Sequence, residues 1–526
     1  MADRWDRGLA VLLTLLAVIL HATFFASAGG LWRDEANSIH QARLAGWNEL
    51  WGSLKHDSFP ILYPALLRIW SSLSWTASDA GLRLFGFLVG LANLATFWAI
   101  ARLLNVSFPI ATLIFLALNP VMIVEGDSIR PYGLSILFIV WTYALLGRCI
   151  GEPRGVHLGL AALMAVLSVQ SSYTNAVLVA VCTVCSVFAS LIQRRGASAW
   201  KLLLPAMCAA FSLLPYVETL RAAGTWASIV HDKTVWGEVF RQIAGPAGKA
   251  APVFLAIWIV IFSLPALFLA GVMKDRQTGG APSPLLLYSA SAAVLALLCQ
   301  IAFLLATDAV PFLRYFLGCL AFAALAVELF LRERSPGLLR AAAATVLLLT
   351  AWPTWSWTRL LRTNADVLAA VIESGARAQD VVIIAPWFLN TSFQRYYHGA
   401  APWVTIPDLE KHPMIRYDLI KLKILDGDSN RNLGDLLDRV FKADGSVWFV
   451  SQPYLENVTG RQRPLRPEAS PSPNGGDYVR FRTFWELDGK YLLASAAAGQ
   501  VVALPGERRI WCEERLVLTR WQRRKH

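Results

Sequence analysis

The chain has 526 residues, of which 56% are hydrophobic and 16% are charged, and its mean hydropathy is +0.47. Soluble domains carry about a quarter charged residues, so this composition excludes an ordinary soluble enzyme. The net charge of +12 does not indicate nucleic-acid binding, because the basic residues lie between apolar segments, as they do in polytopic membrane proteins.

About eleven apolar segments are candidates for crossing roughly 30 Å of hydrocarbon. In chain order they cover residues 9–27, 82–101, 107–124, 132–150, 156–172, 174–192, 201–219, 251–273, 284–306, 312–331 and 338–357. The first is interpreted as an uncleaved helix rather than a signal peptide, because many spans follow it. The fifth and sixth form either a tight hairpin or one broken helix.

The distribution of lysine and arginine predicts the orientation. With a cytoplasmic N-terminus, the inside loops are short and densely basic, whereas the outside loops are longer and dilute in positive charge. The inside residues are Arg4, Arg7, Arg102, Arg148, Arg154, Arg194, Arg195, Lys201, Lys274, Arg276, Arg332, Arg334 and Arg340. An odd number of spans then places everything after residue 360 outside, and we expect a multi-pass protein of the bacterial inner membrane.

Two regions outside the spans are predicted to be structured. In the loop 28–81, the spacing of Leu44, Trp47, Trp51 and Leu54 predicts an interfacial helix, and Leu62 to Leu73 predicts a second one. After residue 358 the composition changes. Helices are expected at 366–376 and 433–441, strands at 380–386 and 446–450, and a proline-rich loop at 463–476.

The predicted organisation is therefore a transmembrane bundle, residues 1–358, followed by a small extracytoplasmic α/β domain, residues 359–526. No glycine-rich phosphate-binding fingerprint is present in the C-terminal region. Seven cysteines predict no disulfide framework, and the CxxC spacing of Cys182 and Cys185 lacks the second pair or histidine that a metal site needs.

Polar and charged groups gather at the ends of spans on the predicted outer side. Ionisable residues in such positions indicate a shared polar cavity. They occur in five clusters: Asp34-Glu35, Asp57 with the following Tyr63, Glu125 to Tyr132, Ser171 to Asn175, and Thr307 to Tyr315.

Each cluster also has a structural interpretation. Asp34 and Glu35 are placed to cap a juxtamembrane helix, because acids are favourable at a helix N-terminus. Arg130 and Arg314 are placed to reach lipid head groups, and tyrosines at span ends are common interfacial residues. The functional hypothesis rests on the coincidence of all five clusters on one side.

The combined set suits transfer of a group from a lipid phosphate to a hydroxyl. A carboxylate accepts the hydroxyl proton, arginines and tyrosines hold the phosphate, and apolar walls accept a lipid tail.

The pattern resembles the GT-C membrane glycosyltransferases, specifically the protein mannosyltransferase and aminoarabinose transferase branch (glycosyltransferase family 39/83-like). The matching pieces are Asp34-Glu35, Arg130-Pro131-Tyr132, Arg314-Tyr315, and residues 57–63 against the family stretch D-x-H-P-P-L-Y. The resemblance covers roughly residues 1–330. One departure is Phe59, which stands where the family has histidine.

The resemblance implies an inverting transfer from a polyprenyl-phosphate sugar on the outer face, to a glycan, lipid or protein acceptor. It implies that Asp34 is the general base and that Glu35 supports it. Arg314, with Arg130 or Arg33, would neutralise the donor phosphate. Asp57, Tyr63, Glu125, Tyr132 and Tyr315 complete the expected substrate-binding set. No cofactor is expected: the acidic pair is able to bind a divalent ion, but without a second ligand set no metal is favoured.

Two other functions fit a polar cavity in a helical bundle. A transporter or flippase for a lipid-linked or amphipathic substrate is the main alternative, although transporters often show internal repeats and ionisable groups at mid-membrane. A scaffold with a degenerate site is the second, against which the intact Asp34-Glu35 and Arg314-Tyr315 argue.

Overall fold

The structure is a computed structural model of the chain, and it is mostly helical. It describes residues 2–150, 152–193, 199–230, 236–277, 283–426, 430–456, 458, 460, 462–506 and 508–523. By its internal contacts the chain forms two compact units. The first comprises residues 1–27, 57–219 and 234–359, and the second comprises 28–56, 220–233 and 360–526. The sequence-based division at 358/359 placed residues 28–56 with the bundle, whereas here they fold with the C-terminal part of the chain.

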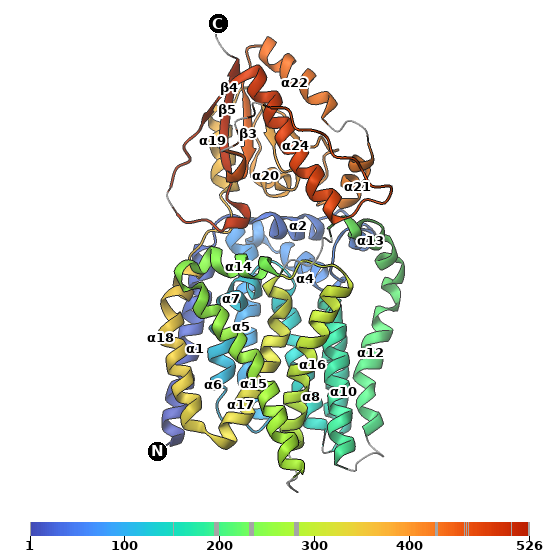
Figure 1. Cartoon of the computed structure of the whole chain (residues 1–526), viewed down its shortest axis with the longest axis vertical. Coiled ribbons are helices and arrows are strands. Elements are labelled where there is room, and N and C mark those ends of the chain that lie inside the picture. The colour runs from blue at the N-terminus through green and yellow to red at the C-terminus, as the bar shows by residue number, and fades with distance from the viewer. Residues whose placement is uncertain are drawn as a thin grey trace. The chain divides into compact units, whose positions relative to one another are not determined.

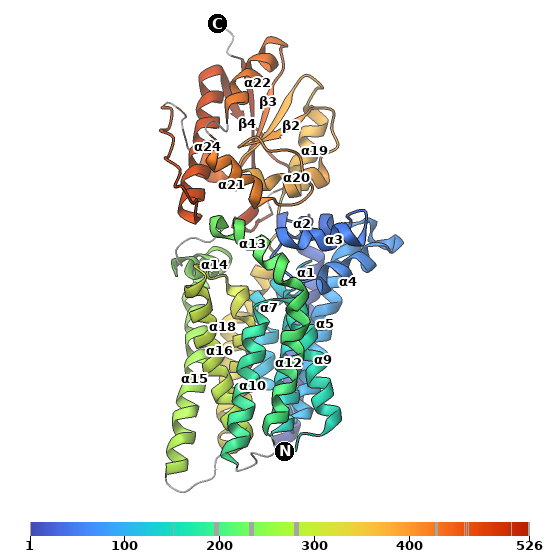
Figure 2. The same ribbon diagram turned by 90° about the vertical axis from the view of Figure 1, so that its right-hand side faces the viewer.

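The first unit is a bundle of apolar helices (Figures 1 and 2). Within the described residues, nine segments are long and apolar enough to span a membrane. They are Arg4–Ser27, Asp79–Leu103, Tyr132–Cys149, Asn175–Ile192, Trp200–Val230, Gly237–Lys274, Pro284–Ala306, Leu313–Arg332 and Pro336–Thr358. Each overlaps one predicted span. The multi-pass helical fold is therefore confirmed.

The helices of this bundle are α1 (Ala2–Ser27), α5 (Asp79–Leu103), α8 (Tyr132–Cys149), α9 (Gly155–Ser171), α10 (Asn175–Ile192), α12 (Leu204–Leu213), α14 (Gly237–Ala247), α15 (Ala251–Gln277), α16 (Pro284–Ala306), α17 (Leu317–Arg334) and α18 (Pro336–Thr358). Helix α13 (Val217–Val230) continues from α12 through a short 3-10 turn. The fifth and sixth predicted spans are two separate helices, α9 and α10, so they form a hairpin rather than one broken helix.

The remaining predicted span, 107–124, is a broken helix. It consists of α6 (Ile110–Thr112), a π-helical turn over Leu113–Ala117, and α7 (Pro120–Gly126). The break follows from Asn119 and Pro120: the Asn119 side chain accepts a hydrogen bond from the Val121 N–H, and proline suits the first helical turn because it has no N–H to satisfy. One uninterrupted helix was the wrong expectation here.

Helices α1 and α5 run antiparallel, as two contacts between them show. Thr14 Oγ1 accepts a hydrogen bond from Trp98 Nε1 at 3.0 Å, and the rings of Phe25 and Phe87 lie 5.3 Å apart. The start of α1 therefore shares one end of the bundle with the end of α5. Arg340, near the start of α18, pairs with Asp6 at 2.5 Å at that same end.

Short helices follow the first span. They are α2 (Arg33–Ala42), α3 (Trp47–Ser53) and α4 (Leu62–Ser71). The prediction of a helix over 62–73 is confirmed. The prediction over 44–54 is right only from Trp47, because Gly46 precedes that helix as its N-cap. A helix at α2 was expected only in the capping interpretation of Asp34 and Glu35.

The second unit contains a five-stranded mixed sheet in the order β2-β1-β3-β5-β4. Strands β1 (Val381–Ile384), β2 (Trp403–Thr405) and β3 (Val447–Ser451) are parallel, whereas β5 (Val517–Arg523) is antiparallel to both β3 and β4 (Ala497–Val501). Its helices include α19 (Ala365–Gly375), α20 (Asn390–Tyr396), α21 (Tyr417–Leu425), α22 (Arg431–Lys442), α23 (Pro453–Glu456) and α24 (Gly475–Ala496). The predicted alternation of helices and strands is confirmed.

Strands β1 and β3 are buried along their whole length, which explains why they read as continuous apolar runs. A buried carboxylate ties them together. Asp380 accepts hydrogen bonds from the backbone N–H of Ser446 at 2.8 Å and of Arg377 at 3.0 Å, and from Trp448 Nε1 at 3.2 Å. These bonds satisfy the acid at the point where the chain enters β1.

Candidate active site

Two arginines and two aromatic rings meet in the first unit. Arg130 lies in the turn between α7 and α8, and its guanidinium carbon is 4.7 Å from the centre of the Phe59 ring. The Tyr132 ring meets Phe59 edge-on at 5.6 Å. The Tyr132 ring centre also lies 5.4 Å from the guanidinium of Arg314. These four residues form one continuous group, here called the arginine–aromatic cluster.

Arg314 is held in the cluster by rings and by one acid. It belongs to a 3-10 turn, Leu313–Phe316, that leads into α17, and its guanidinium lies 4.1 Å from the Phe312 ring and 5.8 Å from the Tyr315 ring. Glu125 Oε2, at the end of α7, is 4.0 Å from Arg314 Nη1. The side chains are 11% and 5% exposed, so water screens this charge pair only weakly.

Phe59 has a specific place in this arrangement. The family stretch has histidine at this position, and the sequence alone did not indicate what phenylalanine does there. In the structure the Phe59 ring is buried and forms the surface on which the Arg130 guanidinium stacks. A cation over an aromatic face is stabilised by about 0.5–2 kcal/mol, so Phe59 gives Arg130 a stabilising contact in this group.

A buried hydrogen bond between Asp127 and His21 anchors the turn that carries Arg130. Asp127 Oδ2 lies 2.6 Å from Nδ1 of His21 on α1, and both side chains are 2% exposed. Helix α5 makes room for this pair with Gly90, where an added Cβ would lie 2.1 Å from Asp127 Oδ1 and 2.7 Å from His21 Nδ1. The pair thus fixes the α7–α8 turn against α1 and α5.

The segment around Phe59 is held by its own set of contacts. Asp57 Oδ1 accepts a hydrogen bond from the Ser58 N–H at 2.7 Å, and the Ile61 N–H donates to the hydroxyl of Tyr216 at 3.4 Å. Tyr63 is buried and packs against the Phe85 ring at 5.9 Å. Asp57 and Tyr63 therefore flank the ring that enters the arginine–aromatic cluster.

The predicted cluster at residues 171–175 serves packing. Asn175 Nδ2 donates to the hydroxyls of Ser135 and Ser168, both at 2.8 Å. These bonds join α10 to α8 and α9. This polar group belongs to the interior of the bundle rather than to the candidate site.

The acidic pair belongs to the second unit and begins a helix. Asp34 and Glu35 lie in the first turn of α2, as the capping interpretation expected. Glu35 is fully buried and its Oε2 accepts a hydrogen bond from the backbone N–H of Trp32 at 3.4 Å. The Asp34 side chain is 16% exposed, and its Oδ1 lies 3.4 Å from Arg33 Nε. The two acids are thus not equivalent: Glu35 supports the helix start, and Asp34 retains exposure.

The start of α2 is held by residues from the C-terminal part of the chain. The Arg33 backbone N–H donates to Glu514 Oε2 at 2.7 Å, and the Arg33 guanidinium lies 4.6 Å from the Phe388 ring. The Arg362 guanidinium lies 4.6 Å from Trp32 and 3.6 Å from Trp511, whose rings stack with each other at 6.1 Å. None of these partners was predicted, because their separation along the chain leaves no local pattern.

Burial and neighbouring charges shift the pKa values of the groups around Asp34. Burial raises the pKa of Glu514 to about 7, although its hydrogen bonds and the charge of Arg33 act in the other direction. Burial also opposes the charge of Arg33, but the nearby acids Asp34 and Glu513 outweigh it and raise the pKa of that guanidinium. Arg33 is therefore a permanent cation beside Asp34.

Of the ten predicted site residues, the structure brings together Glu125, Arg130, Tyr132, Arg314 and Tyr315 in the first unit. In the second unit it brings together Arg33, Asp34 and Glu35. In the part of the chain that the structure describes, no group of three His, Cys, Asp or Glu side chains has the arrangement of a metal site. The expectation that no metal takes part stays a prediction.

No protein-family model and no curated protein matches this chain by sequence. Several solved structures, however, match it in fold. The apo structure of ArnT from Cupriavidus metallidurans aligns with a TM-score of 0.51 and 14% identity over 98% of both chains. The fold is similar to that of ArnT. This confirms the GT-C fold that the sequence resemblance implied.

Two further structures match with lower scores. ArnT from the same organism bound to undecaprenyl phosphate aligns with a TM-score of 0.37 and 12% identity, over 98% of both chains. The oligosaccharyltransferase of Archaeoglobus fulgidus, in complex with zinc and sulfate, aligns with a TM-score of 0.47 and 13% identity, over 95% of this chain and 72% of that one.

Proposed function

We propose that this protein is an integral membrane glycosyltransferase that moves a sugar from a polyprenyl-phosphate donor to an acceptor hydroxyl, with inversion. The observation that carries the proposal is the arginine–aromatic cluster at the end of an apolar bundle with the ArnT-like fold. ArnT itself has been solved with undecaprenyl phosphate, which supports a lipid phosphate as the donor class.

The cluster suits a phosphate at a membrane surface. Guanidinium groups bind phosphate oxygens through two parallel hydrogen bonds, and Arg130 and Arg314 are oriented by ring stacking before any ligand arrives. Pre-orientation lowers the entropy lost on binding. Glu125 would hold Arg314 in place, and Tyr132 and Tyr315 would offer hydroxyl groups to phosphate or sugar.

The bundle also offers a surface for a lipid tail. An apolar pocket of about 460 Å³ lies between α1 and α18 in the first unit, lined by residues such as Leu16, Leu20, Leu347 and Trp352. A polyprenyl chain is entirely hydrocarbon, so a dry, apolar lining matches its chemistry.

In the proposed reaction, Asp34 accepts the proton of the acceptor hydroxyl as its oxygen bonds to the anomeric carbon. The bond between that carbon and the phosphate oxygen breaks on the opposite face, which inverts the configuration. Polyprenyl phosphate leaves with the electron pair, and Arg314 with Arg130 or Arg33 stabilises its charge. A phosphate leaving group needs no protonation, so one carboxylate suffices, and Glu35 keeps Asp34 in position. We propose no metal, because the arginines supply the positive charge.

The proposed location is the bacterial inner membrane, with the N-terminus in the cytoplasm and the C-terminal part outside. The asymmetry of lysine and arginine among the loops supports this orientation. The acceptor is a hydroxyl of a glycan, a lipid or a protein.

Donor binding tests the proposal directly. The purified protein in detergent is titrated with undecaprenyl phosphate, and binding is followed by native mass spectrometry. Arg314→Ala should weaken binding about tenfold or more, because it removes a charged hydrogen-bonding partner of the phosphate. Arg359→Ala is the matched control, since Arg359 is an exposed arginine stacked on Trp355 at the end of α18. Equal affinity of wild type and Arg314→Ala would remove Arg314 from the donor site.

A further inference from the structure

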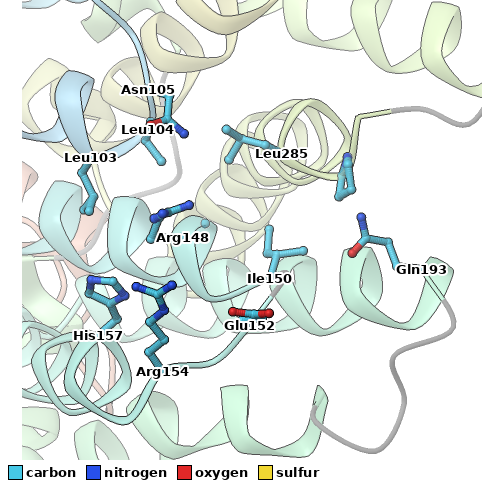
Figure 3. A pocket seen from close by; sticks show the side chains of 12 residues that line it. Leu103, Leu104, Asn105, Arg148, Ile150, Glu152, Arg154, His157, Gln193 and Leu285 are labelled. Carbon is cyan, nitrogen blue, oxygen red and sulfur yellow. The ribbon is translucent and has the colours of Figure 1, made fainter.

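A polar pocket lies at the end of the bundle opposite to the arginine–aromatic cluster. Its volume is about 380 Å³, and it is formed by the end of α5, the end of α8, the start of α9, the end of α10 and the start of α16 (Figure 3). Tyr132, the first residue of α8, belongs to the arginine–aromatic cluster, and Arg148, in its last turn, lines this pocket. Eighteen helical residues extend about 27 Å, which is close to the thickness of the hydrocarbon core. The two sites therefore lie near opposite membrane surfaces.

The pocket lining carries net positive charge. Arg148 and Arg154 line it together with His157 and a single acid, Glu152. Figure 3 shows the side chains of Arg148, Arg154 and His157 gathered where α8 passes into α9. In the part of the chain that the structure describes, the guanidinium groups of Arg148 and Arg154 have no ion-pair or side-chain hydrogen-bond partner. Two guanidinium groups against one carboxylate leave the lining with an excess of positive charge, which favours an anion.

The same pocket also offers hydrogen-bonding groups and an apolar wall. Gln193 contributes a buried Oε1 that has no hydrogen-bond partner in the described structure, and it lies across the pocket from the arginines (Figure 3). Leu104, Ile150 and Leu285 supply apolar surface from three different segments. A free inorganic anion would use the arginines but would leave the apolar wall and the Gln193 oxygen without a partner.

We propose that this pocket binds the head group of an anionic phospholipid that carries a phosphate and a hydroxyl, such as phosphatidylglycerol. Arg148 and Arg154 contact the phosphate, the head-group hydroxyl donates to Gln193 or Glu152, and the acyl chains follow the apolar lining. Basic pockets between the ends of transmembrane helices recognise lipid head groups by this combination of charge and apolar surface. The proposal does not depend on the transferase function, since the pocket lies away from the arginine–aromatic cluster.

The test compares lipids and variants on the whole protein purified in detergent. Native mass spectrometry measures the affinity for phosphatidylglycerol, phosphatidylethanolamine and phosphatidylcholine, and a thermal-shift titration with inorganic phosphate forms a separate arm. Each arginine near a lipid phosphate is expected to change affinity about fivefold, so Arg148→Gln with Arg154→Gln should weaken phosphatidylglycerol binding about thirtyfold. Both arginines are exposed, so the double variant should fold normally.

Arg102→Gln is the matched control, because Arg102 is an exposed arginine at the end of α5 that does not line the pocket. It should leave phosphatidylglycerol binding unchanged. Equal loss in Arg102→Gln and the double variant would show a diffuse surface attraction and overturn the proposal. Equal affinity for all three lipids would overturn it too, and so would stabilisation by inorganic phosphate that matches that of phosphatidylglycerol.

Discussion

At the scale of single residues, Arg130 and Arg314 were predictable as candidates but their surroundings were not. A charged residue at a span end is visible in the sequence, because the apolar runs on either side mark it. The ring under Arg130 is not visible, since Phe59 comes from a distant loop and stands where the family motif has histidine. Likewise, nothing local marked Arg362 or Glu514 as supports of the Asp34 turn.

Phe59 should contribute to phosphate binding through Arg130. Phe59→Leu keeps an apolar side chain but removes the aromatic face, so the orientation of the guanidinium is lost. Undecaprenyl phosphate binding should weaken about 2- to 30-fold, which corresponds to about 0.5–2 kcal/mol for a cation–π contact. Phe87→Leu is the control, because it removes a ring that packs on Phe25 outside the cluster. If the two variants bind the lipid equally well, Phe59 is only a packing residue.

At the scale of elements, apolar length predicted the spans because it is a local property of the sequence. Irregularities were harder to predict. The break before α7 had a signal in Asn119-Pro120, whereas the start of α2 had only the acidic pair. Helix α2 is polar by composition yet largely buried, because its side chains pack within the second unit rather than face water. Tertiary burial of that kind leaves no periodic pattern.

Helix α5 should tolerate no side chain at the crossing with the α7–α8 turn. Gly90→Ala would push a Cβ against the Asp127 and His21 side chains, so either the pair separates or the turn moves. Forcing a methyl group into a packed interior costs about 1–3 kcal/mol. The melting temperature of the protein in detergent should fall, and undecaprenyl phosphate binding should weaken with it.

Gly271→Ala serves as the comparison on α15, where an added Cβ meets nothing within 4 Å. Alanine favours a helix over glycine, so this variant should melt at the wild-type temperature or slightly above it. A wild-type melting temperature for Gly90→Ala would mean that the His21–Asp127 hydrogen bond does not fix the turn.

At the scale of the whole molecule, the ionisable groups of the arginine–aromatic cluster lie at the ends of spans. Tyr132 begins α8, and Arg314 immediately precedes α17. A transporter of the kind considered above would more often carry such groups at mid-membrane. This placement fits the proposed transferase, whose reaction takes place at one membrane surface.

The predicted orientation places the C-terminal part of the chain outside. Ser472 is exposed in a loop before α24, so a cysteine there should react with a membrane-impermeant maleimide on intact spheroplasts. The background variant is Cys512→Ser, because Cys512 is itself exposed. Gly337→Cys, at the start of α18, should be protected until the membrane is permeabilised. Protection of Ser472→Cys together with labelling of Gly337→Cys would reverse the orientation.

The most direct test of the account is the rate of sugar transfer by Asp34→Asn. Undecaprenyl-phosphate-linked hexoses and pentoses are incubated with the purified enzyme and an envelope fraction, and the released undecaprenyl phosphate is measured. Loss of a general base should lower the rate at least about 100-fold while undecaprenyl phosphate binding stays unchanged. Asp435→Asn, at an exposed acid of α22, should keep the wild-type rate. A wild-type rate in Asp34→Asn would contradict the central assignment.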